Sequence, residues 1–160
     1  MTTEQTRFRS LMGRLVTGIT VVATDSPNGV MAMTANAVTA VSLDPLIVLV
    51  CVRNESRMLP VLLEGKRFSI NLLSAAQLEV SRHYGGRQQE ACPASWGRDA
   101  NGTPMLDGAN ASFACVLDHA QRVGDHTVVY GRVRAMDGGE AAAPALVYAA
   151  GRYADLPLAA

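Results

Sequence analysis

The sequence of 160 residues lacks several features that mark common classes of protein. It has no net charge at pH 7 and a single lysine, Lys66, so no global field attracts nucleic acid or anionic lipid. Its three cysteines, Cys51, Cys92 and Cys115, form no Cys-x-x-Cys pair, which argues against a disulfide framework and a zinc site. No apolar run approaches the roughly 20 residues of a membrane-spanning helix, and residues 1–15 lack a signal-peptide core. These absences predict a cytoplasmic protein that binds neither nucleic acid nor membrane.

The amino-acid composition of the chain is that of a folded domain. Hydrophobic residues make up 49% of the chain and charged residues 18%, a balance typical of globular proteins. No shift of composition divides the chain, so we expect a single domain over residues 1–160. Glycine-rich dinucleotide fingerprints and phosphate-binding loops of the Walker type are missing, which argues against a Rossmann-type parallel sheet.

Short strands dominate the predicted secondary structure. Alternating β-branched residues around the turn Ser-Pro-Asn-Gly predict a hairpin over residues 18–43. Residues 46–53 are apolar on both faces, as in a central strand covered on both sides. Further strands are expected at residues 67–73, 111–123, 126–137 and 144–156.

Helices are expected in three places. Capping boxes predict two of them, one beginning after Thr2 and one after Ser74, and a third follows residue 54. Residues 87–110 show no period and are expected to form a long functional loop. This order of elements favours a small antiparallel β-barrel with helices outside it, and the apolar content predicts that a second subunit covers one surface.

The stretch MTANAVTAVSLDP places small polar groups where large hydrophobic residues would pack better. Alternation along one strand puts Thr34 and Asn36 on one face, and Thr39 on the opposite face unless a bulge intervenes. Small side chains allow a flat ligand to approach the backbone, and the hydroxyls and the amide can bond its carbonyls and ring nitrogens. A barrel wall that needs small residues for curvature explains the pattern equally well. The candidate ligand contacts here are Thr34, Ala35, Asn36, Ala37 and Thr39.

Two serine–arginine pairs are candidates for anion binding. Asn54, Ser56 and Arg57 lie where an apolar strand ends and a helix begins, which suits a phosphate group. Ser81 and Arg82 repeat the pairing in a later helix. The alternative is that both arginines are solvated on helix surfaces.

A histidine in the segment GDHT is the candidate catalytic residue. A turn places His126 at the start of a strand, where its ring can act as a base or hold an amide or a phosphate. A structural role is the alternative. His83 and His119 show no metal-ligand spacing with it, so no metal site is expected. Cys92 has no obvious paired base, so a cysteine nucleophile is not expected either.

The ordered set of motifs resembles the flavin reductase family, the small reductase components of two-component flavin monooxygenases. The resemblance runs from about Phe8 to Tyr153. The segments that carry it, in order, are GITVVAT, MTANAVTAVSLDPLIVLVCV, NESR, FSINLL, PML, FAC, GDHTVVYGRV and LVYAAGRY.

The resemblance implies a homodimeric Greek-key split β-barrel of the FMN-binding type that oxidises NADH or NADPH and reduces FMN or FAD. The strand residues listed above would line the isoalloxazine ring. Ser56, Arg57, Ser81 and Arg82 would contact the ribityl chain and phosphate. His126 and Tyr153 would flank the nicotinamide, with Tyr148 as the alternative to Tyr153.

The function expected from the resemblance is hydride transfer from nicotinamide C4 to flavin N5, with delivery of reduced flavin to a monooxygenase. Two alternatives keep the fold: a flavin- or haem-binding protein without turnover, and a flavin enzyme that acts directly on an organic substrate. The choices between FMN and FAD and between NADH and NADPH stay open. An arginine near a 2′-phosphate would be Arg87, Arg98 or Arg152.

Overall fold

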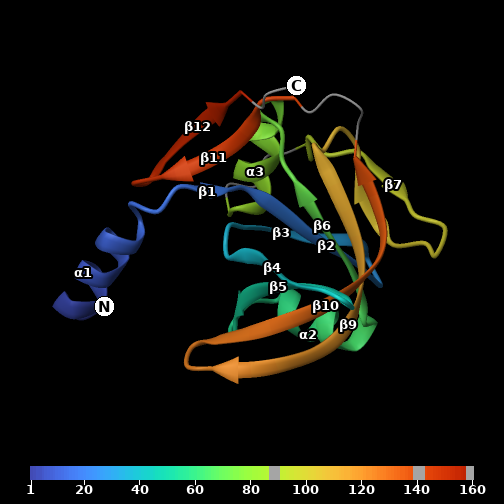
Figure 1. Ribbon diagram of the computed structural model, residues 1–160, viewed down its shortest axis with the longest axis horizontal. Coiled ribbons are helices and arrows are strands. Elements are labelled where there is room, and N and C mark those ends of the chain that lie inside the picture. Colours follow the sequence, from blue (N-terminus) through green and yellow to red (C-terminus); the bar gives the residue numbers. More distant parts are fainter. Residues whose placement is uncertain (87–90, 139–142, 158–160) are drawn as a thin grey trace.

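A seven-stranded antiparallel sheet forms the body of the computed structural model, which describes residues 1–86, 91–138 and 143–157 (Figure 1). The strand order is β3-β2-β6-β9-β10-β5-β4. The strands are β2 (Thr20–Ser26), β3 (Gly29–Ala35), β4 (Val38–Leu43), β5 (Leu46–Arg53), β6 (Arg67–Leu72), β9 (Ala111–Val123) and β10 (His126–Gly138). Within this order β6, β9 and β10 are successive neighbours and β5 returns to lie beside β10, which is a Greek-key arrangement.

The two edges of this sheet are consecutive in the chain. Only Asn36 and Ala37 separate β3 at one edge from β4 at the other, so the sheet must curl until its edges meet. Among the described residues no ladder joins β3 to β4, and the barrel is therefore split at this point. The predicted antiparallel barrel is confirmed.

The barrel interior is filled by inward-facing strand residues and by α2 (Met58–Gly65), which packs against β2. Gly131 allows the tightest approach, since a Cβ there would collide with the Phe68 ring. The main core residues include Val22, Val50, Leu62, Phe68 and Val129.

Smaller elements surround the barrel (Figure 1). The helix α3 (Leu78–Tyr84) follows a 3₁₀ turn, η1 (Ala75–Gln77), and the predicted capping boxes at Thr2 and Ser74 are both present. α1 (Thr3–Met12) buries none of its residues. The remaining strands are β1 (Thr17–Gly18), β11 (Ala145–Ala149) and β12 (Arg152–Leu156), which form a three-stranded sheet, and the pair β7 (Trp96–Arg98) and β8 (Pro104–Leu106). No helix in the described ranges is long and apolar enough to cross a membrane.

Two sequence predictions about the strands are wrong. The hairpin over residues 18–43 ends at Ala35, because the chain bends at Asn36 and Ala37 and β4 then pairs with β5. The segment 87–110 is not one irregular loop, because β7 and β8 form a hairpin within it. Residues 87–90 of that segment lie outside the described residues.

One face of β5 is open, contrary to the prediction that both faces are covered. Val50 and Val52 point into the core and are almost fully buried, whereas the alternate residues Ile47, Leu49 and Cys51 are only partly buried. The apolar sequence of β5 therefore has cover on one side only within this chain.

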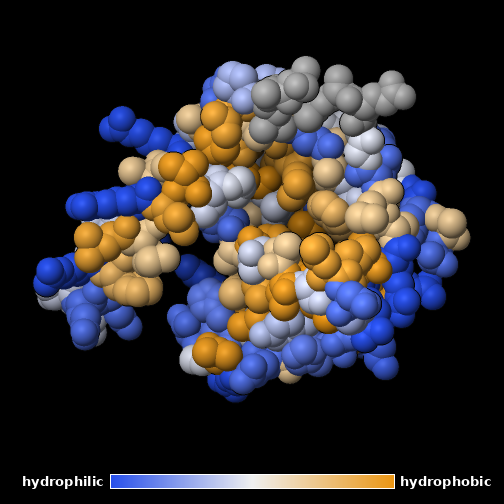
Figure 2. All heavy atoms as spheres, viewed as in Figure 1, coloured by the Kyte–Doolittle hydropathy of each residue, from blue (hydrophilic) through white to orange (hydrophobic). Residues whose placement is uncertain are grey.

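The open face continues onto the neighbouring strands. Leu49 pairs with Tyr130 of β10 and with Thr39 of β4, and Cys51 pairs with Val128. We call the residues Thr39, Ile47, Leu49, Cys51, Val128 and Tyr130 the open face. Figure 2 shows apolar side chains gathered on the viewed face over the centre of the body and over the N-terminal helix.

Candidate functional site

Three of the predicted ligand contacts converge from distant parts of the chain. Thr34 Oγ1 donates a hydrogen bond to the carbonyl oxygen of Ser81 (2.7 Å), which ties β3 to α3. Ser81 Oγ, whose residue is fully buried, donates to Tyr153 Oη of β12 (3.1 Å). We call Thr34, Asn36, Ser81, Arg82 and Tyr153 the Ser81 cluster.

Asn36 joins this cluster at the split of the barrel. Its Nδ2 donates to Thr17 Oγ1 of β1 (3.2 Å), while its Oδ1 keeps an open acceptor among the described residues. Tyr148, the alternative to Tyr153, lies beside it in an edge-to-face contact with ring centroids 5.1 Å apart. Only Tyr153 is hydrogen-bonded to Ser81, so the structure brings Tyr153 rather than Tyr148 into the cluster through its hydroxyl.

Arg82 carries a polar atom that the described residues leave unsatisfied. Its Nη1 is paired with Glu79, one turn earlier in α3, but its Nε is buried and has no hydrogen-bond partner in the described part of the chain. A buried N–H without an acceptor is costly, so an acceptor oxygen from a bound molecule would stabilise it. Phosphate, hydroxyl and carbonyl oxygens, all present in a flavin nucleotide, fit this requirement.

The other predicted contacts in this stretch, Ala35, Ala37 and Thr39, lie on the two sides of the split. The Ala37 carbonyl accepts a hydrogen bond from Cys51 N of β5 (3.0 Å), and Ala35 pairs with Thr20 of β2. Thr39 lies on β4, and its hydroxyl makes only a weak contact to the Ala40 carbonyl (3.4 Å). The prediction of one alternating strand through Thr34 and Thr39 is wrong, because the bend resets the faces. The alanines still leave the backbone accessible.

A second group of predicted residues gathers around His126. Asn54 Nδ2 donates to the Gly124 carbonyl (3.0 Å), and Thr127 Oγ1 donates to Asn54 Oδ1 (2.8 Å). Gly124 has φ +60°, a conformation that favours glycine in the turn before His126. Both ends of the Asn54 amide are therefore committed to holding this turn, and Asn54 is placed as a positioning residue.

His126 itself is oriented by its neighbour. Its Nδ1 lies 2.8 Å from Asp125 Oδ1, and this hydrogen bond lowers the pKa of the Asp125 carboxyl below its usual value. The Nε2 atom has no partner in the ranges described. With Nδ1 engaged, Nε2 is the ring nitrogen left to meet a ligand.

His126 borders a cavity of about 940 Å³ between α1 and the ends of β5 and β10. We call it the His126 cavity. Its charged lining was not predicted from the sequence, because the pairing of Arg53 with His126 across two strands is visible only in the fold. The lining residues are Met1, Glu4, Gln5, Phe8, Arg9, Arg53, Glu55, Asp125 and His126.

Ser56 and Arg57 lie at the start of α2. Ser56 precedes the N-cap residue Arg57, and its Oγ accepts a hydrogen bond from Met58 N (3.2 Å) while its O–H remains able to donate. Arg57 is exposed and forms no ion pair in the described segments. Both residues follow Asn54 closely in the chain, and neither lines the His126 cavity.

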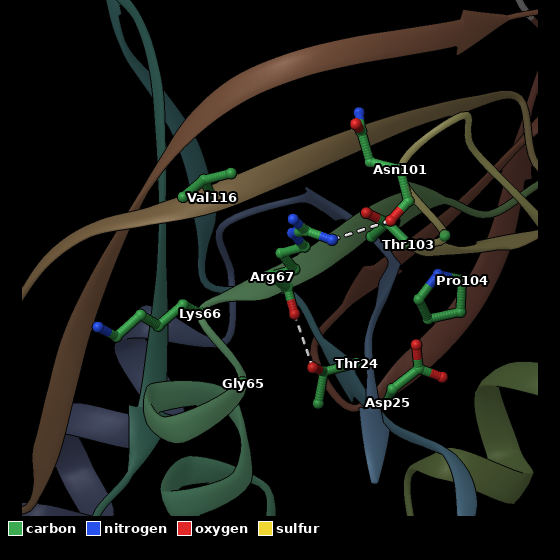
Figure 3. Close-up of a pocket in the computed structure, with 10 residues that line it drawn as sticks. Thr24, Asp25, Gly65, Lys66, Arg67, Asn101, Thr103, Pro104 and Val116 are labelled. Atoms are coloured by element: carbon green, nitrogen blue, oxygen red, sulfur yellow. Dashed lines mark hydrogen bonds between the residues drawn. The ribbon is translucent and has the colours of Figure 1, made fainter.

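A further cavity, of about 450 Å³, lies where β2 ends and β6 begins, next to Thr24 and Arg67 (Figure 3). Arg67 reaches across it to the carbonyl of Asn101, and Thr24 Oγ1 donates to the Arg67 carbonyl. Asp25 beside it forms a bidentate pair with Arg98 (2.8 Å), whose hydrogen bond lowers the pKa of the Asp25 carboxyl. These contacts fasten the β7–β8 hairpin to the barrel.

The candidates for a 2′-phosphate contact are scattered. Arg98 is held by Asp25 at the cavity of Figure 3, and Arg152 is exposed at the start of β12. Arg87 lies outside the described residues. Neither described arginine lines the His126 cavity.

Comparison with known proteins resolves the family. Residues 12–157 match the model of the flavin reductase like domain. The FMN reductase (NADH) RutF of Stutzerimonas stutzeri is 33% identical over 132 residues, which are 81% of this chain and 76% of that protein.

Solved structures agree over nearly the whole chain. Flavin reductase PheA2 in its native state superposes with a TM-score of 0.89 at 30% identity, covering 99% of this chain and 100% of that one. The styrene monooxygenase flavin reductase (SMOB) from Pseudomonas putida S12 gives a TM-score of 0.87 at 34% identity, covering 96% and 99%. The resemblance and the split-barrel fold expected from the sequence are confirmed, and the chain belongs to the flavin reductase like domain family.

Proposed function

We propose that this protein transfers a hydride from NADH to FMN and supplies the reduced flavin to a partner monooxygenase. The observation that carries the proposal is the Ser81 cluster, where four uncharged polar side chains lie at the split of the barrel together with Arg82, whose buried Nε is unsatisfied among the described residues. NADH and FMN are chosen because the relative RutF is named an FMN reductase (NADH), and the monooxygenase because the similar structure SMOB serves one. FAD and NADPH are the alternatives that the test must include.

The flavin side of the site is assigned to the split. When bound, FMN supplies the acceptor for the hydride. Ala35 and Ala37 leave room for a flat ring against the backbone, and Asn36 Oδ1 can accept from a ring N–H. Arg82 Nε donates to an oxygen of the ribityl or phosphate chain, and Ser56 and Arg57 supply a further donor and a positive charge.

The nicotinamide side is assigned to His126. Its free Nε2 holds the carboxamide, while Asp125 fixes the ring through Nδ1 and Asn54 fixes the turn that carries both. Tyr153 was expected to flank the nicotinamide, and its hydrogen bond from Ser81 supports assigning it to the proposed flavin side. Hydride transfer needs aligned rings more than acid–base groups, so this chain's contribution is to bind and orient.

The functional unit in this proposal is a homodimer. The open face is a contiguous sheet surface of mostly apolar residues, and the exposed Leu43 of β4 (87% exposed) borders it. Apolar area of this kind is usually covered by a partner, and a second copy of the chain is the partner that we propose. Sedimentation of the wild type and of Leu49→Glu tests this, since a wild-type monomer would contradict it.

The decisive test is oxidation of NADH or NADPH at 340 nm by the purified protein with excess FMN or FAD. We expect flavin-dependent oxidation, fastest with NADH and FMN. If no pair reacts although flavin binds, the proposal fails, and a binding protein or an enzyme for an organic substrate replaces it. A cytoplasmic location is part of the proposal, because NADH is regenerated there.

A further inference from the structure

The His126 cavity carries more charge than the proposed hydride transfer requires. One wall is α1, with Glu4 in its first turn and Arg9 in its last turn, and the other is the end of β5 at Arg53 and the turn after it with Glu55. In Figure 1 α1 stands apart from the main sheet, and the cavity lies between it and the strand ends. Hydride transfer itself requires only the end of the cavity that His126 borders.

Two of these charges match the diphosphate of a dinucleotide. Arg53 pairs with His126 across the ladder, so their side chains leave the same face within roughly 5 Å at Cβ. The hydrogen bond with His126 makes the main contribution to the lowered pKa of Asp125, and the positive charge of Arg53 adds a minor one. A nicotinamide held at His126 therefore brings the following diphosphate, with its two negative charges, toward Arg53 and Arg9.

The carboxylates of the cavity bear on whether the adenosine ribose carries a free 2′-hydroxyl or a 2′-phosphate. Asp125 is engaged by His126, whereas Glu4 and Glu55 are exposed and form no ion pair within the described ranges. A 2′-phosphate adds about −1.5 to −2 charges, and the described lining offers no third cationic side chain to receive it. A carboxylate instead accepts a hydrogen bond from a free ribose 2′-hydroxyl.

We propose that Glu4 and Glu55 make the cavity selective for NADH against NADPH, by accepting from the adenosine 2′-hydroxyl and repelling a 2′-phosphate. Arg53 and Arg9 bind the diphosphate of either nucleotide. This inference rests on the proposed function, because it assumes that the nicotinamide lies at His126.

Binding without turnover gives the cleanest test. ADP-ribose and 2′-phospho-ADP-ribose are titrated calorimetrically into the FMN-loaded protein, wild type and Glu4→Gln/Glu55→Gln. We expect wild type to bind the 2′-phosphorylated probe at least about tenfold more weakly, and the double variant to reduce that ratio roughly tenfold. Glu64→Gln, an exposed glutamate of α2 outside the cavity, is the matched control and should keep the wild-type ratio.

Three results would overturn the inference: an unchanged ratio in the double variant, an equal change in Glu64→Gln, or no binding of ADP-ribose to wild type. Arg53→Gln should weaken both probes by a similar factor, whereas Arg122→Gln, on β9 outside the cavity, should weaken neither.

Steady-state rates separate this inference from the proposed function. If wild type oxidises neither NADH nor NADPH with any flavin, the proposed function fails. If wild type oxidises NADH but the double variant keeps the same ratio of kcat/KM for NADH and NADPH, only the selectivity inference fails.

Discussion

The Ser81 cluster and the His126 cavity lie on either side of the same split, and they are built from opposite kinds of residue. Ser81 is fully buried, and it is held by a hydrogen bond from the Thr34 hydroxyl to its carbonyl oxygen and by one from its own hydroxyl to Tyr153. The His126 side chain is 37% exposed and its surroundings are charged and open. The first region is preorganised before a ligand arrives, and the second gives access and exchange.

The difference also separates stability from selectivity. Breaking a buried hydrogen bond costs about 1 kcal/mol or more, so changes in the Ser81 cluster should affect both folding and flavin affinity. Exposed charges around the cavity are screened by water and salt, so they contribute little to folding and act mainly on which nucleotide binds. A tightly held flavin beside an exchanging dinucleotide is what this contrast predicts.

The largest effect is expected for His126→Ala. It removes the only side chain assigned to the nicotinamide, so kcat/KM for NADH should fall roughly 100-fold, while the Kd for FMN changes less than about threefold. Stopped-flow oxidation and flavin fluorescence titration measure the two quantities. His119→Ala is the matched control, because His119 stacks on Tyr130 and does not line the cavity. Equal losses of both quantities in His126→Ala would remove the distinction between the two regions.

The reverse pattern is expected for the Ser81 cluster. Ser81→Ala and Tyr153→Phe each break the bond between α3 and β12, so the Kd for FMN should rise roughly fivefold, with little change in the KM for NADH. Tyr148→Phe keeps that bond and should bind FMN as wild type does. If Tyr148→Phe is the variant that loses affinity, the assignment of Tyr153 is wrong.

Asn54→Ala tests whether positioning alone matters on the His126 side. The change frees the Gly124 turn and leaves Thr127 without its acceptor, so kcat should fall several-fold and the free energy of unfolding by about 1–2 kcal/mol. Asn54→Asp keeps the acceptor for Thr127 and loses the donor to Gly124, and it should recover part of both losses. Urea unfolding and the split between kcat and KM measure them. A full kcat in a destabilised Asn54→Ala would mean that the turn does not orient His126.

Features that depend on neighbouring residues in the chain, such as helix starts, could be predicted from the sequence. Capping residues determine where helices begin, so the boxes at Thr2 and Ser74 were correctly identified. The small polar strand and the residue His126 were identified with the help of the family resemblance. The candidates for a 2′-phosphate contact do not follow this division, because Arg98 is held by Asp25 away from both regions and Arg87 lies outside the described residues.

The pairing of strands that are distant in the chain could not be predicted from local sequence patterns. The bend at Asn36 brings the chain from one edge of the sheet to the other, and a single asparagine, although it favours turns, does not mark a bend within a strand-like stretch. The apolar run of β5 looked like a buried central strand, because periodicity reports that a face is apolar without saying which chain covers it. Arg53 joins His126 at the cavity because β5 pairs with β10, and α1 supplies the facing charges of Glu4 and Arg9 from a distant part of the chain.

The smallest effect is expected at the cavity of Figure 3, which belongs to neither region. Asp25→Asn removes a carboxylate whose pKa is lowered in the folded protein, chiefly by its hydrogen bond from Arg98. A lowered pKa stabilises the fold above the unfolded value of 3.8, and this stabilisation is lost as the pH falls through the folded value. The pair is half exposed, so the variant should melt only about 1–2 °C below wild type at pH 7.

The same variant should show no difference in melting once the pH lies below the lowered pKa of the Asp25 carboxyl in the folded protein, because the carboxyl is then protonated in both states. At pH 7 its affinities for FMN and ADP-ribose should equal those of wild type, because Asp25 and Arg98 fasten the β7–β8 hairpin and touch neither region. Thermal unfolding at both pH values and the two titrations are the measurements. A loss of affinity for either ligand would mean that the flavin or the dinucleotide extends to this end of the barrel, and the two-region description would have to include it.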